Sequence, residues 1–130
     1  MIVKIDQAKA AYLWRRFYTD SNNLMKNVSA VALNPSSTLL AVHCHSDDFM
    51  IGYVFAVDTL NGGLASSPAK INHNNKFIVR SAGLKMKNDG NILLAFDSEQ
   101  TDTDLLPGGY AARLRAGAYN SNTSQMIYLT

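Results

Sequence analysis

The segment Val28–Cys44 reads VSAVALNPSSTLLAVHC, and it decides the class of fold that we expect. Two runs of apolar and β-branched residues, 28–33 and 38–44, flank NPSS, a type I turn sequence with proline at its second position. YVFAVDT follows at 53–59 and leads to NGG, where glycine supports the positive φ of a hairpin. One candidate helix, 8–18, lacks a clean apolar stripe at helical spacing. The sequence therefore predicts an all-β chain.

The strand pattern repeats along the chain. The segment 28–62 aligns with 80–117, so that Ser29-Ala30 falls on Ser81-Ala82, and IVKID at 2–6 aligns with VFAVD at 54–58 as a half copy. A period of about 50 residues with four strands per unit is typical of a β-propeller blade. We therefore predict one domain, 1–130, that forms a partial β-propeller of about two and a half blades. Its parts are a half blade at 1–19 and blades at 28–73 and 78–130, and the alternative is a compact β-sandwich.

The chain resembles the β-propeller repeats of secreted and surface proteins through the pattern VKID…LWRRFYTDSNN…VSAVALNPSSTLLAV. The resemblance implies a fold and says little about activity, because propellers host binding proteins, scaffolds and enzymes alike. An unclosed propeller leaves flat apolar sheet faces exposed, which soluble monomers avoid. We therefore expect contact with other protein, as a homo-oligomer or within a larger assembly.

Composition narrows the class of protein further. The chain has 130 residues, of which 47% are hydrophobic and 17% charged, which favours a packed domain over disorder. A net charge of +2, with Lys and Arg scattered along the chain, gives no reason to expect a nucleic-acid partner. No apolar run reaches the roughly 20 residues that a membrane-spanning helix needs. Cys44 is the single cysteine, which excludes an intrachain disulfide.

Two sequons bear on the cellular location. Asn27-Val28-Ser29 and Asn122-Thr123-Ser124 both match the N-glycosylation pattern. They favour an extracellular or cell-surface location, with Asn27 and Asn122 as glycosylation sites. A cytoplasmic location is the alternative, since a lone cysteine also suits a reducing compartment.

Two groups of residues are candidates for ligand binding, and with them for a metal ion. His43 and His45 alternate along one strand and so share a face, and with Asp47 or Asp48 they offer ligands for zinc or copper, although a structural role for the histidines is favoured. An acidic segment read as a loop, 97–109, supplies oxygen donors for calcium, but without EF-hand spacing. Its carboxylates are Asp97, Glu99, Asp102 and Asp104. No other cofactor is expected.

The remaining chemistry points away from catalysis. Trp14, Phe17 and Tyr18 could stack on a sugar ring, but packing between sheets is the favoured role for aromatics in such strands. No serine lies in a glycine-flanked elbow, and no phosphate-binding glycine loop is present. We therefore expect a non-enzymatic structural or interaction module. The alternatives are an oligomeric carbohydrate-binding lectin and a fragment of a larger propeller enzyme.

Overall fold

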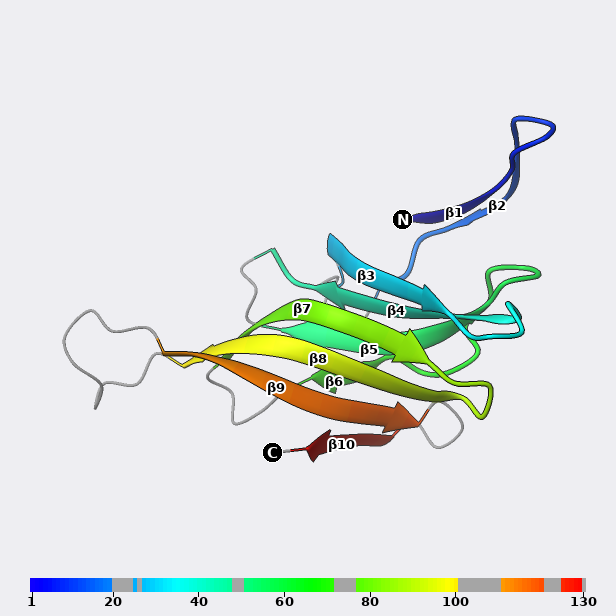
Figure 1. Ribbon diagram of the computed structural model, residues 1–130. Helices are drawn as coiled ribbons and strands as arrows, with labels where there is room; N and C mark the ends of the chain where they lie inside the picture. The colour runs from blue at the N-terminus through cyan, green and yellow to red at the C-terminus, as the bar shows by residue number, and fades with distance from the viewer. Residues whose placement is uncertain are drawn as a thin grey trace.

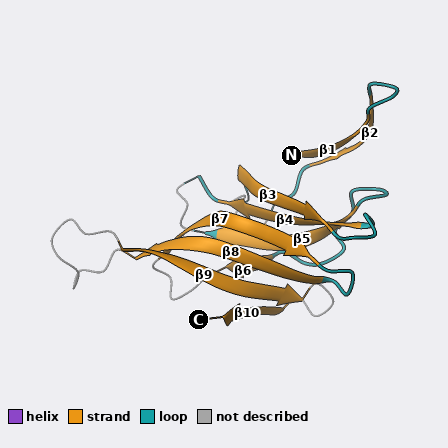
Figure 2. Cartoon of the chain, in the orientation of Figure 1, coloured by secondary structure: helices purple, strands orange, loops and turns teal. Residues whose placement is uncertain are grey.

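The fold is all-β in a computed structural model that describes residues 1–19, 25, 27–47, 51–71, 77–100, 111–120 and 125–129 (Figure 1). In 77–82, 96–100, 111–120 and 125–129 it describes the backbone alone. These residues form strands joined by turns, and no helix occurs among them (Figure 2). The prediction of an all-β chain is confirmed.

The strands form three antiparallel sheets, each following the order of the chain. The first is a hairpin of β1 (Ile2–Asp6) and β2 (Ala11–Arg16). The second, in the order β3-β4-β5-β6, comprises Asn27–Leu33, Leu39–His45, Gly52–Asp58 and Ala69–Ile71. The third, in the order β7-β8-β9-β10, comprises Phe77–Met86, Asn91–Gln100, Ala111–Asn120 and Gln125–Leu129. These groups nearly coincide with the ranges 1–19, 28–73 and 78–130, and their interpretation as propeller blades stays a prediction.

The first hairpin replaces the candidate helix. The Asp6 carboxylate accepts hydrogen bonds from the backbone N–H groups of Ala8 (3.0 Å) and Lys9 (3.3 Å), and Ala10 has a positive φ of 51°. An aspartate that binds the backbone two residues on favours a turn over a helix. The chain reverses there, and the residues that follow pair with β1 as strand β2.

A buried asparagine holds the turn between β3 and β4. Asn34 accepts, through Oδ1, from the backbone N–H groups of Thr38 (2.9 Å) and Leu39 (3.0 Å). Its Nδ2 donates to the hydroxyl groups of Ser36 and Thr38, each at 3.0 Å. The backbone N–H of Ser36 in turn donates to Asn88 Oδ1 in the β7–β8 turn (3.1 Å), so the turns of two sheets are joined at this end.

The sheet β3–β6 is the middle layer, because it packs on both faces. One face packs against β7 and β8, around a core of Ala41, Val54, Ala56, Ile71, Met86, Ile92 and Leu94. The other packs against the hairpin, around a core of Trp14, Met25, Val42, Cys44, Tyr53, Phe55 and Val57. Residues of β4 and β5 alternate between the two cores, as the period of a strand requires. These two strands are therefore covered on both sides.

The sheets remain open. They stack face to face, as sheets do both in a β-sandwich and between propeller blades. Across the described residues the three sheets do not close into a ring, so a propeller is not shown. No helix in that part of the chain is long and apolar enough to cross a membrane.

Candidate functional site

The predicted histidine site lies inside the molecule. His43 is completely buried on the face of β4 that packs against β7, and its Nδ1 is hydrogen-bonded to Ser29 Oγ. His45 is also buried, and its Nδ1 bonds to the Ser46 carbonyl oxygen at 2.7 Å. Burial, with a smaller contribution from His45, lowers the pKa of His43 to about 4. His43 is therefore uncharged at neutral pH.

This environment suits neither a metal ligand nor a catalytic base. No group of three His, Cys, Asp or Glu side chains that could hold a metal ion occurs among the described residues. Asp47 points to solvent and accepts from Asn27 Nδ2 (2.8 Å), and Asp48 lies outside the described residues. A histidine with a pKa near 4 is also a weak base for the neighbouring Ser29 hydroxyl. The structural role favoured for the histidines fits this geometry.

The acidic segment begins as a strand. Asp97 and Glu99 lie in β8, where they pair with Arg80 and Ile78 of β7, so the prediction that a loop starts at residue 97 is wrong. The error arises because DSEQ at 97–100 is a continuous polar run, which is typical of a loop, whereas pairing with β7 and β9 extends strand β8 through it. Asp102 and Asp104 fall outside the described residues, so the calcium site stays a prediction.

Of the two asparagines that the sequons predict as glycosylation sites, the structure describes Asn27. Asn27 begins β3 and is exposed, and β3 is an edge strand of its sheet. Asn122 lies outside the described residues. Asn27 therefore presents its amide at the surface, where it binds Asp47.

The aromatic residues divide between core and surface. Trp14 is buried, and Nε1 donates to the Thr59 carbonyl oxygen (3.0 Å). Tyr18 donates to the Gly62 carbonyl oxygen (2.8 Å), and its ring packs against Phe55 with the centroids 5.3 Å apart. Of the three residues predicted to stack on a sugar, Phe17 alone, 75% exposed, remains open to a ligand. Trp14 and Tyr18 thus fix the hairpin to the middle sheet and are not available as a sugar-stacking platform.

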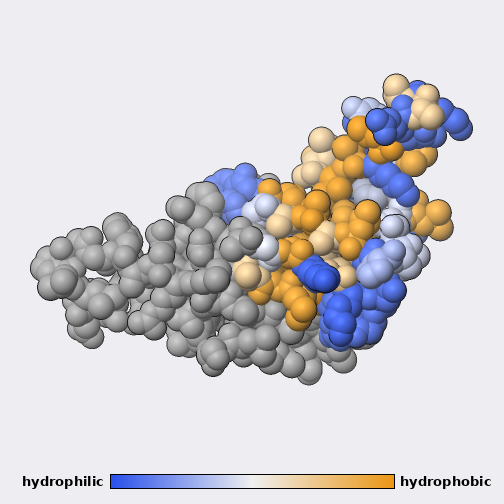
Figure 3. All heavy atoms as spheres, in the orientation of Figure 1, coloured by the Kyte–Doolittle hydropathy of each residue, from blue (hydrophilic) through white to orange (hydrophobic). Residues whose placement is uncertain are grey.

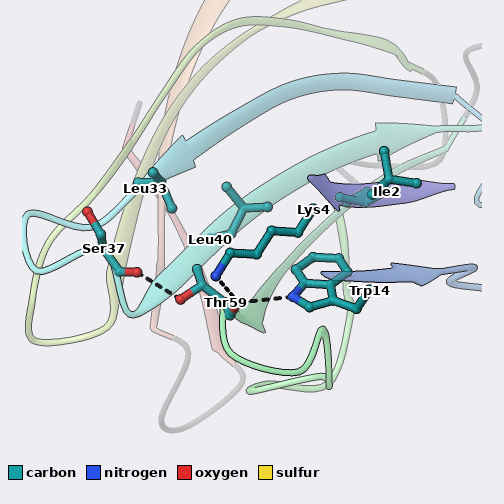
Figure 4. Close-up of a pocket in the computed structure, with 8 residues that line it drawn as sticks. Ile2, Lys4, Trp14, Leu33, Ser37, Leu40 and Thr59 are labelled. Atoms are coloured by element: carbon teal, nitrogen blue, oxygen red, sulfur yellow. Dashed lines mark hydrogen bonds between the residues drawn. The ribbon is translucent and has the colours of Figure 1, made fainter. Parts of the chain in front are cut away.

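A pocket lies where the hairpin meets the middle sheet, and no sequence pattern indicated it (Figure 4). Its volume is about 270 Å³, and it is lined by Ile2, Val3, Lys4, Trp14, Leu33, Ser37, Leu40 and Thr59. Lys4 Nζ donates to the Thr59 carbonyl oxygen (2.8 Å), the same oxygen that Trp14 binds, and the Thr59 hydroxyl donates to the Ser37 carbonyl oxygen (2.8 Å). Lys4, Trp14 and Thr59 are thus partnered within the chain, and the open surface of the pocket is mostly apolar.

Two exposed apolar surfaces adjoin this pocket. The first, the β3 strip, consists of Val28, Val31 and Leu33, which are 44%, 53% and 53% exposed. The second, the outer hairpin face, is the side of β1–β2 away from the middle sheet. It consists of Val3, Ile5, Tyr12, Leu13 and Phe17, all of them exposed; Val3, at the edge of the hairpin, also contributes to the lining of the pocket. Figure 3 shows hydrophobic atoms running from the hairpin onto the neighbouring part of the molecule.

Comparison with known proteins adds no assignment: no protein-family model, curated protein or solved structure matches this chain. The pocket and the two apolar surfaces are therefore the features on which a function must be argued.

Proposed function

We propose that this chain is a non-enzymatic interaction module, which packs with other protein chains through the outer hairpin face and extends a stack of β-sheets of the β-propeller type. The observation that carries the proposal is the apolar character of that face. Its residues point away from the chain's own core, yet they include Ile5 and Leu13, which are 53% and 55% exposed. The last layer of a stack needs a polar outer face for solubility.

The direction of stacking supports the same conclusion. Both four-stranded sheets carry a bulge in the first strand, at Val28/Ala30 and at Ser81/Gly83. Leu33 pairs with Leu40 in the middle sheet as Met86 pairs with Ile92 in the third. Leu40 packs toward the hairpin and Ile92 packs toward the middle sheet, so equivalent residues of the two sheets face the same way.

The hairpin fits this head-to-tail order. The alignment of 2–6 with 54–58 places Val3 and Ile5 on Phe55 and Val57, both buried beneath the hairpin. Val3 and Ile5 are thus equivalent to residues that are covered one layer further along, and we expect another layer to cover them too. Contacts of this head-to-tail kind close into rings or continue as filaments.

Sedimentation velocity over a range of protein concentrations tests the proposal. We expect wild-type protein to associate, and Ile5→Lys to remain at the 14.2 kDa mass of the single chain. Leu60→Lys is the matched control, because Leu60 lies in the β5–β6 connection and is 82% exposed. A wild-type protein that is monomeric throughout, and no less soluble than Ile5→Lys, would contradict the proposal.

The location of the protein belongs to the same proposal. The exposed Asn27 supports an extracellular or cell-surface setting. A loss of mass on endoglycosidase treatment, absent in Asn27→Gln, would support it.

A further inference from the structure

The hairpin has an open edge beside the middle sheet. Within the part of the chain that the structure describes, β1 pairs with β2 and with no strand on its other side. The pocket is lined by Ile2, Val3 and Lys4 of β1 and, across from them, by Leu33 of β3 and Leu40 of β4 (Figure 4). The backbone groups along this edge have no ladder, and unpaired edges are templates for another strand.

The middle sheet continues beneath the space next to that edge. The β3 strip lies on the hairpin side of the sheet, because Val31 pairs directly with Val42, whose side chain belongs to the core under the hairpin. Val31 and Leu33 nevertheless stay 53% exposed. The hairpin therefore covers β5 and leaves β3 open, although both strands present apolar residues on this face.

The rest of the molecule shows what fits such a space. On the opposite face of the middle sheet, β7 packs over β3 and β4, as part of a layer that is four strands wide. β5, the equivalent of β1, pairs antiparallel with β4 on one side and with β6 on the other. Among the described residues, the hairpin layer has two strands, equivalent to β5 and β6, and no described strand occupies the positions equivalent to β3 and β4.

We infer that the β1 edge and the β3 strip form a docking site for a β-strand pair of another polypeptide. Its first strand adds antiparallel to β1, and its apolar residues, at every second position, cover Val31 and Leu33 and enter the pocket. This inference rests on the proposed function and names its partner. The pocket volume of about 270 Å³ suits side chains of a strand, since pockets for drug-sized ligands measure about 300–1,000 Å³.

A second copy of this chain does not fit the same place through its own β1 edge. Two β1 edges related by a two-fold axis pair antiparallel, with the axis perpendicular to the shared sheet. Both middle sheets would then lie on the same side of that sheet. Each middle sheet extends past its own β1 as far as β3, so the two would overlap.

A short synthetic peptide, in which valine alternates with lysine and threonine, is the probe. Trp14 is the only tryptophan and lines the pocket, so binding is followed by its emission and by anisotropy of a labelled peptide. We expect saturable binding to the full chain with a blue shift of Trp14. Two further peptides carry N-methyl groups at alternate residues, each removing the donors along one edge. We expect one of these to lose binding and the other to keep it.

Variants of the chain locate the site. Leu33→Lys removes an apolar contact of the strip, and we expect it to weaken binding by about tenfold or more. Leu93→Lys is the matched control: Leu93 is 43% exposed and alternates with Ile92 and Leu94, so it faces away from the middle sheet. We expect it to bind as wild type does. Circular dichroism and the Trp14 emission of the free variants verify that both are folded.

Several results would overturn the inference. They are the absence of saturable binding, equal binding of both N-methylated peptides, and wild-type affinity in Leu33→Lys. So would a dimer that Leu33→Lys dissociates while no peptide binds, because the occupant would then be a second copy. The Ile5→Lys variant separates the two proposals. If it abolishes self-association while wild-type protein binds no peptide, the stacking function stands and only the strand-docking site fails.

Discussion

Replacing Gly62 with alanine tests how the hairpin is attached to the middle sheet. Gly62 has a φ of +73°, a conformation that residues with a side chain rarely adopt. An added Cβ would lie 2.7 Å from Trp14 Cε3 and 2.8 Å from Arg16 Cγ, closer than such atoms approach. The carbonyl oxygen of the same residue accepts the Tyr18 hydroxyl. Gly62, like Thr59, is therefore a point where the β5–β6 connection contacts β2.

The expected loss of hairpin docking free energy in Gly62→Ala follows from two separate costs. The left-handed backbone costs a non-glycine residue about 1–2 kcal/mol. To relieve the close contact with the added Cβ, Trp14 must move. This movement strains the hydrogen bond from Trp14 to the Thr59 carbonyl oxygen, which costs about 1 kcal/mol, and it reduces the burial of the Trp14 side chain. We expect Gly62→Ala to weaken hairpin docking by about 2–4 kcal/mol. The three atoms nearest to the added Cβ all belong to Trp14 and Arg16 of β2, so we expect the two four-stranded sheets to keep their structure.

Trp14 emission and far-UV circular dichroism separate these outcomes. In Gly62→Ala we expect Trp14 to emit at a longer wavelength than in wild type without denaturant, or its red shift to occur at a lower urea concentration than in wild type. The far-UV circular dichroism of the β-sheets should persist. Gly63→Ala is the matched control in the same turn, because its added Cβ would meet only the flexible Asn61 side chain. Should both variants leave Trp14 emission and the urea midpoint unchanged, the attachment of the hairpin through Gly62 would be refuted.

Three further predictions concern buried polar groups. Because the pKa of His43 is about 4 in the folded chain and 6.5 when exposed, the unfolded state takes up the proton first as pH falls. The contribution of His43 to the free energy of unfolding should therefore be constant above about pH 7 and fall by about 2 kcal/mol by about pH 5. Urea titrations at several pH values should show this difference between wild type and His43→Gln. Asn34→Ala removes the partner of two backbone N–H groups in the β3–β4 turn. It should lower the free energy of unfolding, measured in the same titrations, by about 2–3 kcal/mol. The control is Asn61→Ala, at an exposed position, which should lower it by about 0.5–1 kcal/mol. Lys4→Met keeps the apolar stem but removes the bond to the Thr59 carbonyl oxygen, and should cost about 1 kcal/mol of hairpin docking, measured by Trp14 emission in urea.

Local sequence signals predicted the strands well, because the period of a strand and the chemistry of its turns are local properties. The NPSS turn joins the antiparallel strands β3 and β4, and Gly62 of the NGG sequence has the positive φ, 73°, that was expected there. The candidate helix failed because alanine and arginine favour helices, while the Asp6 side chain and pairing with β1 determine the fold of that segment.

The candidate site was less accessible to sequence reasoning. His43 and His45 were predicted as candidate ligands from their residue type. Whether a strand face meets solvent or another sheet depends on the stacking of sheets that are far apart in sequence. Val31 and Leu33 were not predicted as part of a site, since apolar residues in a strand are expected to be buried. Their exposure follows from the width of the hairpin, a two-stranded layer over a four-stranded sheet, which no local pattern encodes.

The uneven burial of similar strands is the strongest physical reason to look for a partner. β4 and β5 are apolar on both faces and buried on both faces, as the central strands of a layered fold must be. β3 carries a similar apolar face, and β1 and β2 carry apolar residues on both sides, yet each presents such residues to water. Contiguous exposed apolar surface of this kind lowers solubility and is uncommon on soluble monomers. Since an open edge and two apolar surfaces meet at the hairpin, cover supplied by other polypeptides accounts for all three features together.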